Sequence, residues 1–306
     1  MTEARATEPI KVLVIEGKPG DARLIETWLS KADPGFQISH AGGLGEALEA
    51  LERADFDAIL VDLSRTGSSD LETVDRLCIA LPQIPVVILS GRDDEEMALQ
   101  ALQGGVEDYL VKGWGEGDLL VRTIRYAIAR KKAKEKLTYL ALHDPLTGVA
   151  NRALFHDRLE RALARTARSG DAVAVLLLDL DGFKAVNDTL GHAGGDALLQ
   201  EVARRIERRV RRTDTVARLG GDEFAIILEG LTDALNAAIV AQDVLQDLSE
   251  PLELYGHETT VSASLGIAVL PPSEGTRLLM EADAAMYHAK RNGGNDYQFY
   301  TEETTL

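Results

Sequence analysis

The length, composition and charge of the chain predict a globular protein of two domains, because 306 residues exceed the roughly 100–200 of a single domain. Hydrophobic residues at 45% with 27% charged residues exclude a disordered chain, and no apolar run approaches the roughly 18 residues that span a bilayer. The net charge of −17 argues against nucleic-acid binding, and a single cysteine with no apolar leader before Ile10 favours a cytoplasmic protein without membrane insertion.

The first half of the chain alternates short apolar runs with amphipathic stretches. Strands are predicted over 11–15, 58–61 and 85–89, with a helix over 23–31. Continuous apolar strands separated by segments of helical length indicate a parallel sheet that is covered on both faces. We therefore predict a doubly wound, flavodoxin-like α/β domain over 1–118. In such sheets functional groups gather at the carboxyl ends of the strands, where Glu16, Asp62 and Ser90 stand.

A single long helix is predicted over 116–142, because this stretch has no proline and no glycine after Gly117. Its part from 119 to 143 connects the two domains and carries seven Lys and Arg against one Glu. Two interpretations stay open. One is a solvated basic helix, and the other is a helix that pairs in parallel with its copy through a weak heptad. The heptad positions are Leu119, Tyr126, Ala133, Leu137 and Leu140, with Thr123 and Arg130 interrupting.

The second domain, predicted over 144–306, mixes helices with strands that pair antiparallel. The predicted helices cover 153–168, 196–210 and 233–248, and the predicted strands cover 172–178, 224–228 and 260–269. This order is typical of an α+β sheet domain.

Acidic residues follow two of these strands. Asp179 and Asp181 stand at the end of an apolar strand, where carboxylates suit Mg²⁺ and nucleotide phosphates, although an Asp-x-Asp is more often a solvated turn. Gly220, Gly221 and Asp222 interrupt a second apolar stretch before Glu223. Two interpretations of the glycines stay open. One is that they belong simply to an ordinary hairpin. The other is that they let a ligand approach the backbone closely, and that the acids complete a metal site begun by Asp179.

Over about 139–300 these residues resemble the GGDEF diguanylate cyclases, which are related to the nucleotidyl cyclases. The matching positions are His143 to Gly148, Asn151, Arg152, Asp179 to Lys184, Asn187, Asp188, Gly191, His192, Asp196, Gly220 to Phe224, Ser264 to Ala268, Ala282, Asp283, Tyr287 and Lys290. The resemblance implies that the domain condenses two GTP molecules to cyclic di-GMP as a homodimer, because each domain binds one GTP.

The resemblance also implies a role for each site residue. Asp179, Asp222 and Glu223 are the implied catalytic residues. Asp179, Asp222 and the Leu180 carbonyl ligate Mg²⁺ or Mn²⁺, and Glu223 either helps to hold the metal or accepts the proton of the attacking 3′-hydroxyl. Guanine is read by Asn187 and Asp196. The remaining substrate contacts come from Lys184, Lys290, the backbone at Gly182 and Phe183, and the turn glycines Gly220 and Gly221.

Two further positions bear on substrate and product. The family often has Gly-Arg-Asn where this chain has Gly293, Gly294 and Asn295, so a phosphate contact is expected to be absent and GTP binding weaker, unless Arg291 compensates. Arg211 and Asp214 match the family's inhibitory product site for cyclic di-GMP, although charges at this spacing are also common at solvated helix ends.

The first domain resembles the receiver domains of two-component signalling over about 9–130. The resemblance implies that Asp62 is the phosphoacceptor and that Glu16 and Asp62 bind the metal. It also implies that Ser90 and Tyr109 are switch residues and that Lys112 pairs with the phosphoryl group. Receivers usually carry a second acid after the first strand, whereas this chain has Gly17 and Lys18. Phosphorylation of Asp62 by a sensor histidine kinase and a dimerisation module that needs no phosphorylation therefore both stay open.

The two resemblances together imply a response regulator with a diguanylate cyclase output. One alternative is a catalytically weak module that binds GTP or cyclic di-GMP and signals to a partner. Another is a cyclase for a different purine triphosphate, against which the pairing of Asn187 with Asp196 argues.

Overall fold

The computed structural model describes residues 9–63, 68–91, 95–112, 116–270 and 277–301. Contacts divide the chain into two compact units, 1–137 and 138–306. Each unit has its own sheet and its own core. Among the described residues, no helix combines the length and the apolar character that a membrane span requires.

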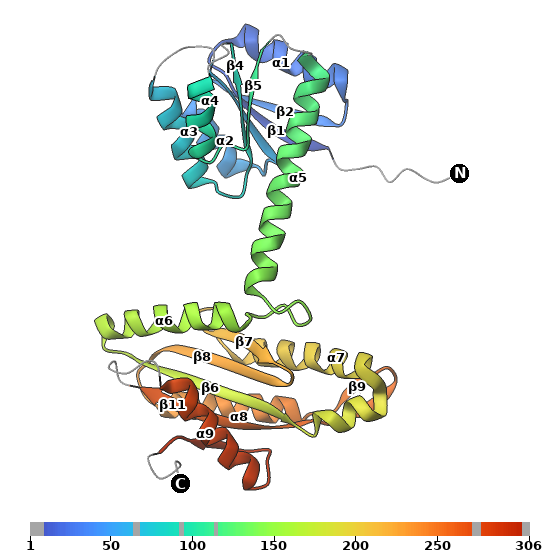
Figure 1. Cartoon of the computed structure of the whole chain (residues 1–306), viewed down its shortest axis with the longest axis vertical. Helices are drawn as coiled ribbons and strands as arrows, with labels where there is room; N and C mark the ends of the chain where they lie inside the picture. Colours follow the sequence, from blue (N-terminus) through green and yellow to red (C-terminus); the bar gives the residue numbers. More distant parts are fainter. Residues whose placement is uncertain (1–8, 64–67, 92–94, 113–115, 271–276, 302–306) are drawn as a thin grey trace. The chain divides into compact units, whose positions relative to one another are not determined.

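The first unit is built on five parallel strands in the order β2-β1-β3-β4-β5 (Figure 1). The strands are β1 (Ile10–Ile15), β2 (Phe36–Ala41), β3 (Ala58–Asp62), β4 (Val86–Ser90) and β5 (Asp108–Val111). The helices before the linker are α1 (Pro19–Ala32), α2 (Leu44–Arg53), α3 (Ser68–Ala80) and α4 (Glu95–Gln103). One core packs α1 and α5 on one face of the sheet, and a second core packs the other three helices on the opposite face. The predicted doubly wound domain is confirmed.

Helix α5 (Glu116–Leu142) covers the predicted stretch without interruption. Leu120, Ile124 and Ala127 are buried against the sheet, whereas every residue from 132 to 141 is exposed. Gly117 allows the helix to approach α1, because a Cβ there would lie 2.7 Å from the Trp28 carbonyl oxygen. The boundary between the two units falls inside this helix, after Leu137.

The second unit is an α+β domain, as predicted. Its five-stranded sheet has the order β12-β11-β6-β8-β7, and all pairs are antiparallel except β11 with β12. These strands are β6 (Ala172–Asp181), β7 (Thr215–Gly220), β8 (Glu223–Leu231), β11 (Ser262–Leu270) and β12 (Tyr297–Phe299), and β9 (Leu252–Leu254) with β10 (His257–Thr259) forms a separate hairpin. Helices α7 (Phe183–Arg209) and α8 (Leu235–Ser249) share one core, while α6 (Arg152–Ser169) and α9 (Leu278–Arg291) share the other.

Helix α7 corrects the prediction of a helix that begins at Asp196. It begins at Phe183, directly after β6, and bends at Gly191, where φ is 72° and ψ is 174°. The bend folds the first part of the helix against the second. A Cβ on Gly194 would lie 2.4 Å from the Leu190 Cβ, so only glycine permits this approach. Residues 187 and 196 are thereby carried on the two arms of one bend.

Candidate functional site

Three acidic residues meet at one end of the sheet of the second unit. Strand β6 runs antiparallel to β8, so the end of β6 lies beside the beginning of β8. Asp179 is directly opposite Glu223, and Asp222 precedes Glu223 in the turn from β7. The sequence predicted this gathering, because each acid flanks a strongly apolar strand.

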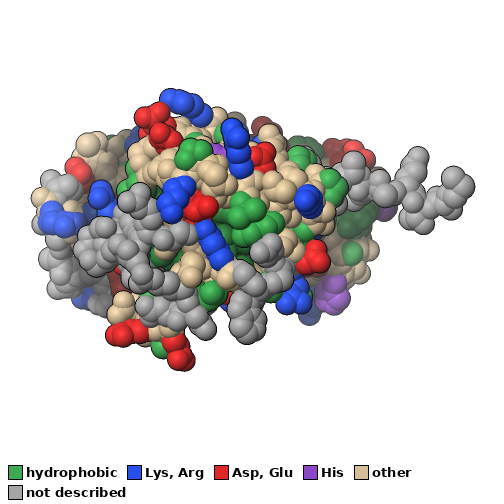
Figure 2. All heavy atoms as spheres, turned by 90° about the horizontal axis from the view of Figure 1, so that it is seen from above, with side chains coloured by type: hydrophobic (Ala, Val, Ile, Leu, Met, Phe, Trp, Pro, Cys, Tyr) green, Lys and Arg blue, Asp and Glu red, His purple; other side chains and the backbone are tan. Residues whose placement is uncertain are grey.

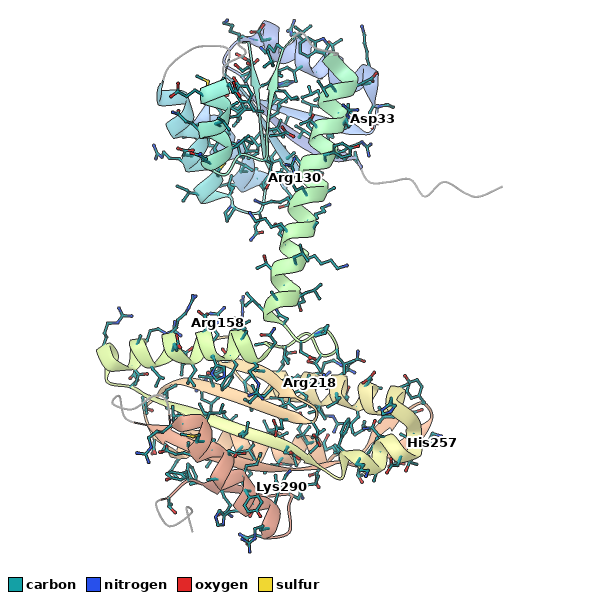
Figure 3. All side chains as sticks on the ribbon, in the orientation of Figure 1. Asp33, Arg130, Arg158, Arg218, His257 and Lys290 are labelled. Carbon is teal, nitrogen blue, oxygen red and sulfur yellow. The ribbon has the colours of Figure 1, made fainter. Side chains whose placement is uncertain are left out.

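The charge around Asp179 is partly balanced by Lys290, whose position near the C-terminus of α9 is labelled in Figure 3. The Lys290 Nζ lies 2.7 Å from Asp179 Oδ1. Burial raises the pKa of Asp179, and the charges of Asp222 and Asp181 raise it further, while the hydrogen bond and charge of Lys290 lower it. An acidic site that already attracts a cationic group fits a divalent cation together with nucleotide phosphates.

The three acids are brought together, but not to the spacing of metal ligands. Among the described residues, only one group of three acidic, His or Cys side chains has all its ligand atoms within 4.8 Å of one another, and that group lies in the first unit. The Leu180 side chain is buried in the core, as its strand position requires. A cation bound at Asp179 would therefore need Asp222 and Glu223 to close toward it.

The turn between β7 and β8 is held by Arg218, labelled in Figure 3. Its Nε and Nη2 donate to the Gly221 carbonyl oxygen at 2.9 and 2.7 Å, and its Nη1 donates to Asp144 at 3.1 Å. Gly220 and Gly221 have φ of 152° and 54°, and in the described structure a Cβ on either would have open space around it. The turn is thus fixed from one side and open on the other.

Asp144 anchors this arrangement to the segment that follows α5. Burial raises the pKa of its carboxyl, but hydrogen bonds from the Thr147 hydroxyl and backbone and from Arg218 outweigh burial, so the pKa is lowered. The roles of Arg218 and Asp144 were not foreseen. Asp144 stands within a matched motif and Arg218 just before one, but only the fold places two segments 74 residues apart in contact.

The residues expected to bind guanine and phosphate surround the first arm of α7. Asn187 is half-buried against Gly195, where a Cβ would lie 2.0 Å from Asn187 Oδ1. Asp196 is exposed on the following turn, and Lys184 is exposed near the helix start. The backbone at Gly182, with φ of 74°, opens the helix immediately after β6. A helix N-terminus at the end of a strand is a favourable position for a phosphate.

The contacts of Asp181 explain how the loop accommodates a glycine at position 294. Its carboxylate accepts hydrogen bonds from the hydroxyls of Ser262 (3.0 Å) and Ser264 (2.8 Å) and from the Asn295 backbone N–H (3.0 Å). Gly294 has φ of 71°, and a Cβ there would lie 2.8 Å from Asp181 Oδ2. The loop in this form has no room for an arginine side chain at position 294.

Arg291 is engaged elsewhere. Its guanidinium carbon lies 5.9 Å from the ring centroid of Tyr287, one turn earlier on α9. This cation–π contact holds the side chain along the helix. In this conformation Arg291 does not supply the phosphate contact that Gly294 lacks.

Arg211 and Asp214 lie beside a basic groove of about 870 Å³. The groove is lined by Arg158, Arg165, Thr166, Arg168, Asp171, Arg211, Arg212, Thr213, Glu229 and Gly230. The Asp214 carboxylate accepts the backbone N–H groups of Arg211 (2.8 Å) and Glu229 (3.3 Å), so it holds the turn in place. Arginine side chains along an open groove suit a ligand with phosphate groups.

In the first unit, the expected site residues lie at the carboxyl edge of the sheet. Glu16 follows β1, while Asp62, Ser90 and Tyr109 lie on β3, β4 and β5. Figure 2 views this unit from the side of the loops that follow these strands, where acidic and basic side chains surround an apolar patch. Residues 64–67, which follow Asp62, lie outside the described residues.

Lys112 supplies the positive charge at this edge. Its Nζ contacts the Asp62 carboxylate and lies 3.9 Å from Asp21 Oδ2. The Lys18 side chain is exposed, and its backbone N–H donates to Glu16 Oε1 at 2.7 Å. Burial raises the pKa of Glu16 to about 7, and the neighbouring Asp62 carboxyl contributes to that rise.

Both units match known protein families. A family model described as diguanylate cyclase, GGDEF domain, matches residues 141–296, and one for the response regulator receiver domain matches 12–124. Relatives include the bifunctional diguanylate cyclase/cyclic di-GMP phosphodiesterase MucR of Pseudomonas aeruginosa, 49% identical over 60% of this chain and 27% of its own length. The response regulator PleD of Caulobacter vibrioides is 34% identical over 70% of this chain and 49% of its own length.

The solved structures include the coiled coil and GGDEF domain of DgcB from Caulobacter crescentus in complex with c-di-GMP. It matches with a TM-score of 0.55 and 31% identity, over 59% of this chain and 97% of that one. The chain spans half or less of the length of the curated relatives named above.

Proposed function

The chain belongs to the GGDEF family and carries a response regulator receiver domain, and from this premise we propose that it condenses two GTP molecules to cyclic di-GMP with release of two pyrophosphates. The observation that carries the proposal is the meeting of Asp179, Asp222 and Glu223 at one sheet end, with Lys290 bonded to Asp179. Carboxylates for a cation beside an ammonium for phosphate are the groups that phosphoryl transfer requires.

Each residue has a part in binding one GTP. Asp179, the Leu180 carbonyl, Asp222 and Glu223 would hold Mg²⁺ or Mn²⁺, which when bound offsets the charge of the triphosphate. Asn187 and Asp196 bind the guanine edge, since an amide and a carboxylate accept its N–H donors. Lys184, Lys290 and the N–H groups at Gly182 and Phe183 hold the phosphates, and the open turn at Gly220 and Gly221 admits the nucleotide.

The reaction joins two such halves. Glu223 accepts the proton of a 3′-hydroxyl, the oxygen attacks the α-phosphorus of the other GTP, and pyrophosphate leaves. Positioning supplies most of the rate in a reaction of this kind. Because each domain holds one GTP, the active form is a homodimer in which two second units face each other.

Regulation is proposed at two places. Cyclic di-GMP binds the arginine-lined groove at Arg211, with Asp214 fixing the turn that presents this arginine, and slows the enzyme. The receiver unit takes a phosphoryl group on Asp62 from a sensor histidine kinase, with Lys112 as its charge partner and with Ser90 and Tyr109 as the residues that respond.

Product analysis tests the activity. The purified chain is incubated with GTP and Mg²⁺, and the products are separated by chromatography, with ATP as the substrate control. We expect cyclic di-GMP and pyrophosphate from GTP alone, and a fall of about 10²-fold or more for Asp179→Asn or Asp222→Asn. Formation of cyclic di-GMP by both variants at the wild-type rate contradicts the proposed site.

The second candidate is a module that binds GTP or cyclic di-GMP without turning it over. The specific observation in its favour is Gly294, where close packing on Asp181 excludes the arginine of relatives. The same assay separates the two functions. Nucleotide that is bound, as shown by equilibrium dialysis, but recovered unchanged identifies the binding module.

A further inference from the structure

The carboxyl edge of the first sheet carries a third acidic residue, Asp21, beside Glu16 and Asp62. Ligand oxygens of Glu16, Asp21 and Asp62 all lie within 4.8 Å of one another. They come from three elements, namely the end of β1, the first turn of α1 and the end of β3. Three separate elements thus bring carboxylates to one point, a spacing that a single bound cation can bridge.

The buried oxygen of Glu16 indicates that this group is built for a ligand. Glu16 is 8% exposed, and its Oε1 accepts the backbone N–H of Lys18 at 2.7 Å. Its Oε2 is fully buried, and among the described residues no donor reaches it. The Asp62 carboxyl lies beside Glu16, and its side chain is fully buried as well. An acceptor enclosed in this way is costly unless a donor or a cation satisfies it.

The start of α1 explains how Asp21 arrives there. Pro19 opens the helix, and Asp21 is its third residue. Side chains in a helix lean toward its N-terminus, so a carboxylate in the first turn points back to the loop that follows β1. Asp21 also lies 3.9 Å from Lys112, which contacts Asp62. Three carboxylates around one ammonium leave a negative site.

We propose that Asp21 completes a Mg²⁺ site with Glu16 and Asp62, in place of the acid that is missing at Gly17. The receiver unit thereby keeps the cation that phosphoryl transfer to Asp62 requires, through a ligand from the helix instead of the loop. The loop itself tolerates an acid, because Gly17 has ordinary φ and a Cβ there would meet only the Gly42 carbonyl oxygen, at 3.5 Å.

Mn²⁺ serves as the probe, because free Mn²⁺ is counted directly by electron paramagnetic resonance. The whole chain carries Asp179→Asn, which removes the metal ligand proposed for the second unit. Both tryptophans, Trp28 and Trp114, belong to the first unit, so their fluorescence assigns binding to it. We expect one Mn²⁺ per chain, with a tryptophan response that follows its binding and is competed by Mg²⁺.

Three variants in this background decide the role of Asp21. Asp21→Asn is expected to raise the Kd for Mn²⁺ by about tenfold or more. Adding Gly17→Asp to Asp21→Asn is expected to restore binding, whereas Glu26→Gln, an acid on the outer part of the same helix, leaves it unchanged. An unchanged Kd for Asp21→Asn, or no Mn²⁺ bound by the parent chain, overturns the proposal. Circular dichroism confirms that each variant is folded, and none of these outcomes depends on cyclase activity.

Discussion

Asp181 shows how one residue governs a loop at the active-site end of the second sheet. Two serine hydroxyls and a backbone N–H converge on its carboxylate, so both oxygens are engaged in hydrogen bonds. The loop at Gly294 and Asn295 is drawn onto it and follows Lys290 by only a few residues. Although Asp181 stands next to the proposed metal ligands in sequence, its contacts give it a positioning role instead.

Glu16 gives a prediction about pH at the scale of a single residue. Its pKa is about 7 in the folded chain and near 4.5 when exposed, so the folded state binds more protons between these values. The stabilisation is complete below the exposed pKa and is lost as the pH rises through 7, by about 3 kcal/mol in all. In EDTA, the unfolding midpoint of the first unit, followed by tryptophan fluorescence in urea, is expected to fall from pH 5 to pH 8.

The substitution Glu16→Gln removes this titration, and the midpoint is then expected to vary less with pH. Glu26→Gln is the matched control, because Glu26 lies on the same unit but is half-exposed beside His40. Equal pH slopes for the wild type and Glu16→Gln would show that another group carries the dependence.

The sequence allowed prediction of those site residues that flank strands. Asp62, Asp179 and Glu223 were identified because an apolar strand has a defined end, and side chains at that end share one edge of a sheet. Asp21 and Arg218 were not identified in this way, because their contacts are with residues distant in sequence. No periodicity encodes such a contact, so the fold was needed to show it.

At the scale of elements, the bend of α7 is the feature that the sequence did not predict. The segment from 183 to 195 contains three glycines and an Asn-Asp pair, a composition that suggests a loop. The structure keeps it helical on both sides of Gly191, because Phe183, Val186 and Leu190 pack against the core beneath them. Tertiary packing thus overrides a weak local propensity.

The bend predicts the effect of a methyl group at Gly195. The added Cβ would lie 2.0 Å from Asn187 Oδ1, so Gly195→Ala must displace the amide that we propose binds guanine. We expect the KM for GTP to rise about tenfold, equivalent to one lost hydrogen bond, with a smaller change in kcat. Initial rates of cyclic di-GMP formation over a range of GTP concentrations measure both constants.

His192→Ala is the matched control for the bend, since His192 is exposed on the same turn. Its KM for GTP is expected to stay at the wild-type value. Some loss of stability accompanies Gly195→Ala, of about 1–3 kcal/mol for overpacking, so rates are taken well below the melting temperature. If Gly195→Ala leaves the KM for GTP unchanged, Asn187 does not contribute to GTP binding.

At the scale of the whole molecule, α5 is the candidate element through which two chains pair. Its part within the first core is buried on one side, whereas Tyr126, Leu137 and Leu140 are between 45% and 68% exposed. Ala133, Leu137 and Leu140 follow each other at spacings of four and three, as in the seam of a paired helix. The alternative of a solvated helix explains the lysines of this segment but not the exposed leucines.

These leucines give the last prediction. If they form the seam of a dimer, Leu137→Glu with Leu140→Glu places charges in it, and we expect light scattering to show a monomer where the wild type is a dimer. Cyclic di-GMP formation is expected to fall with it, because one domain holds one GTP. The substitutions lie on the exposed part of the helix, so circular dichroism should stay unchanged.

The basic side chains of the same segment supply the control and a second, opposite effect. In a parallel pair, Lys132, Lys134 and Lys136 repel their copies in the other chain. Lys132→Ala with Lys136→Ala is therefore expected to tighten the dimer. Moderate salt screens the repulsion, so it is expected to tighten the wild-type dimer as well. A solvated helix has no reason to respond in opposite directions to these two pairs of substitutions. A wild type that is monomeric at every salt concentration yet fully active would leave α5 as a spacer only.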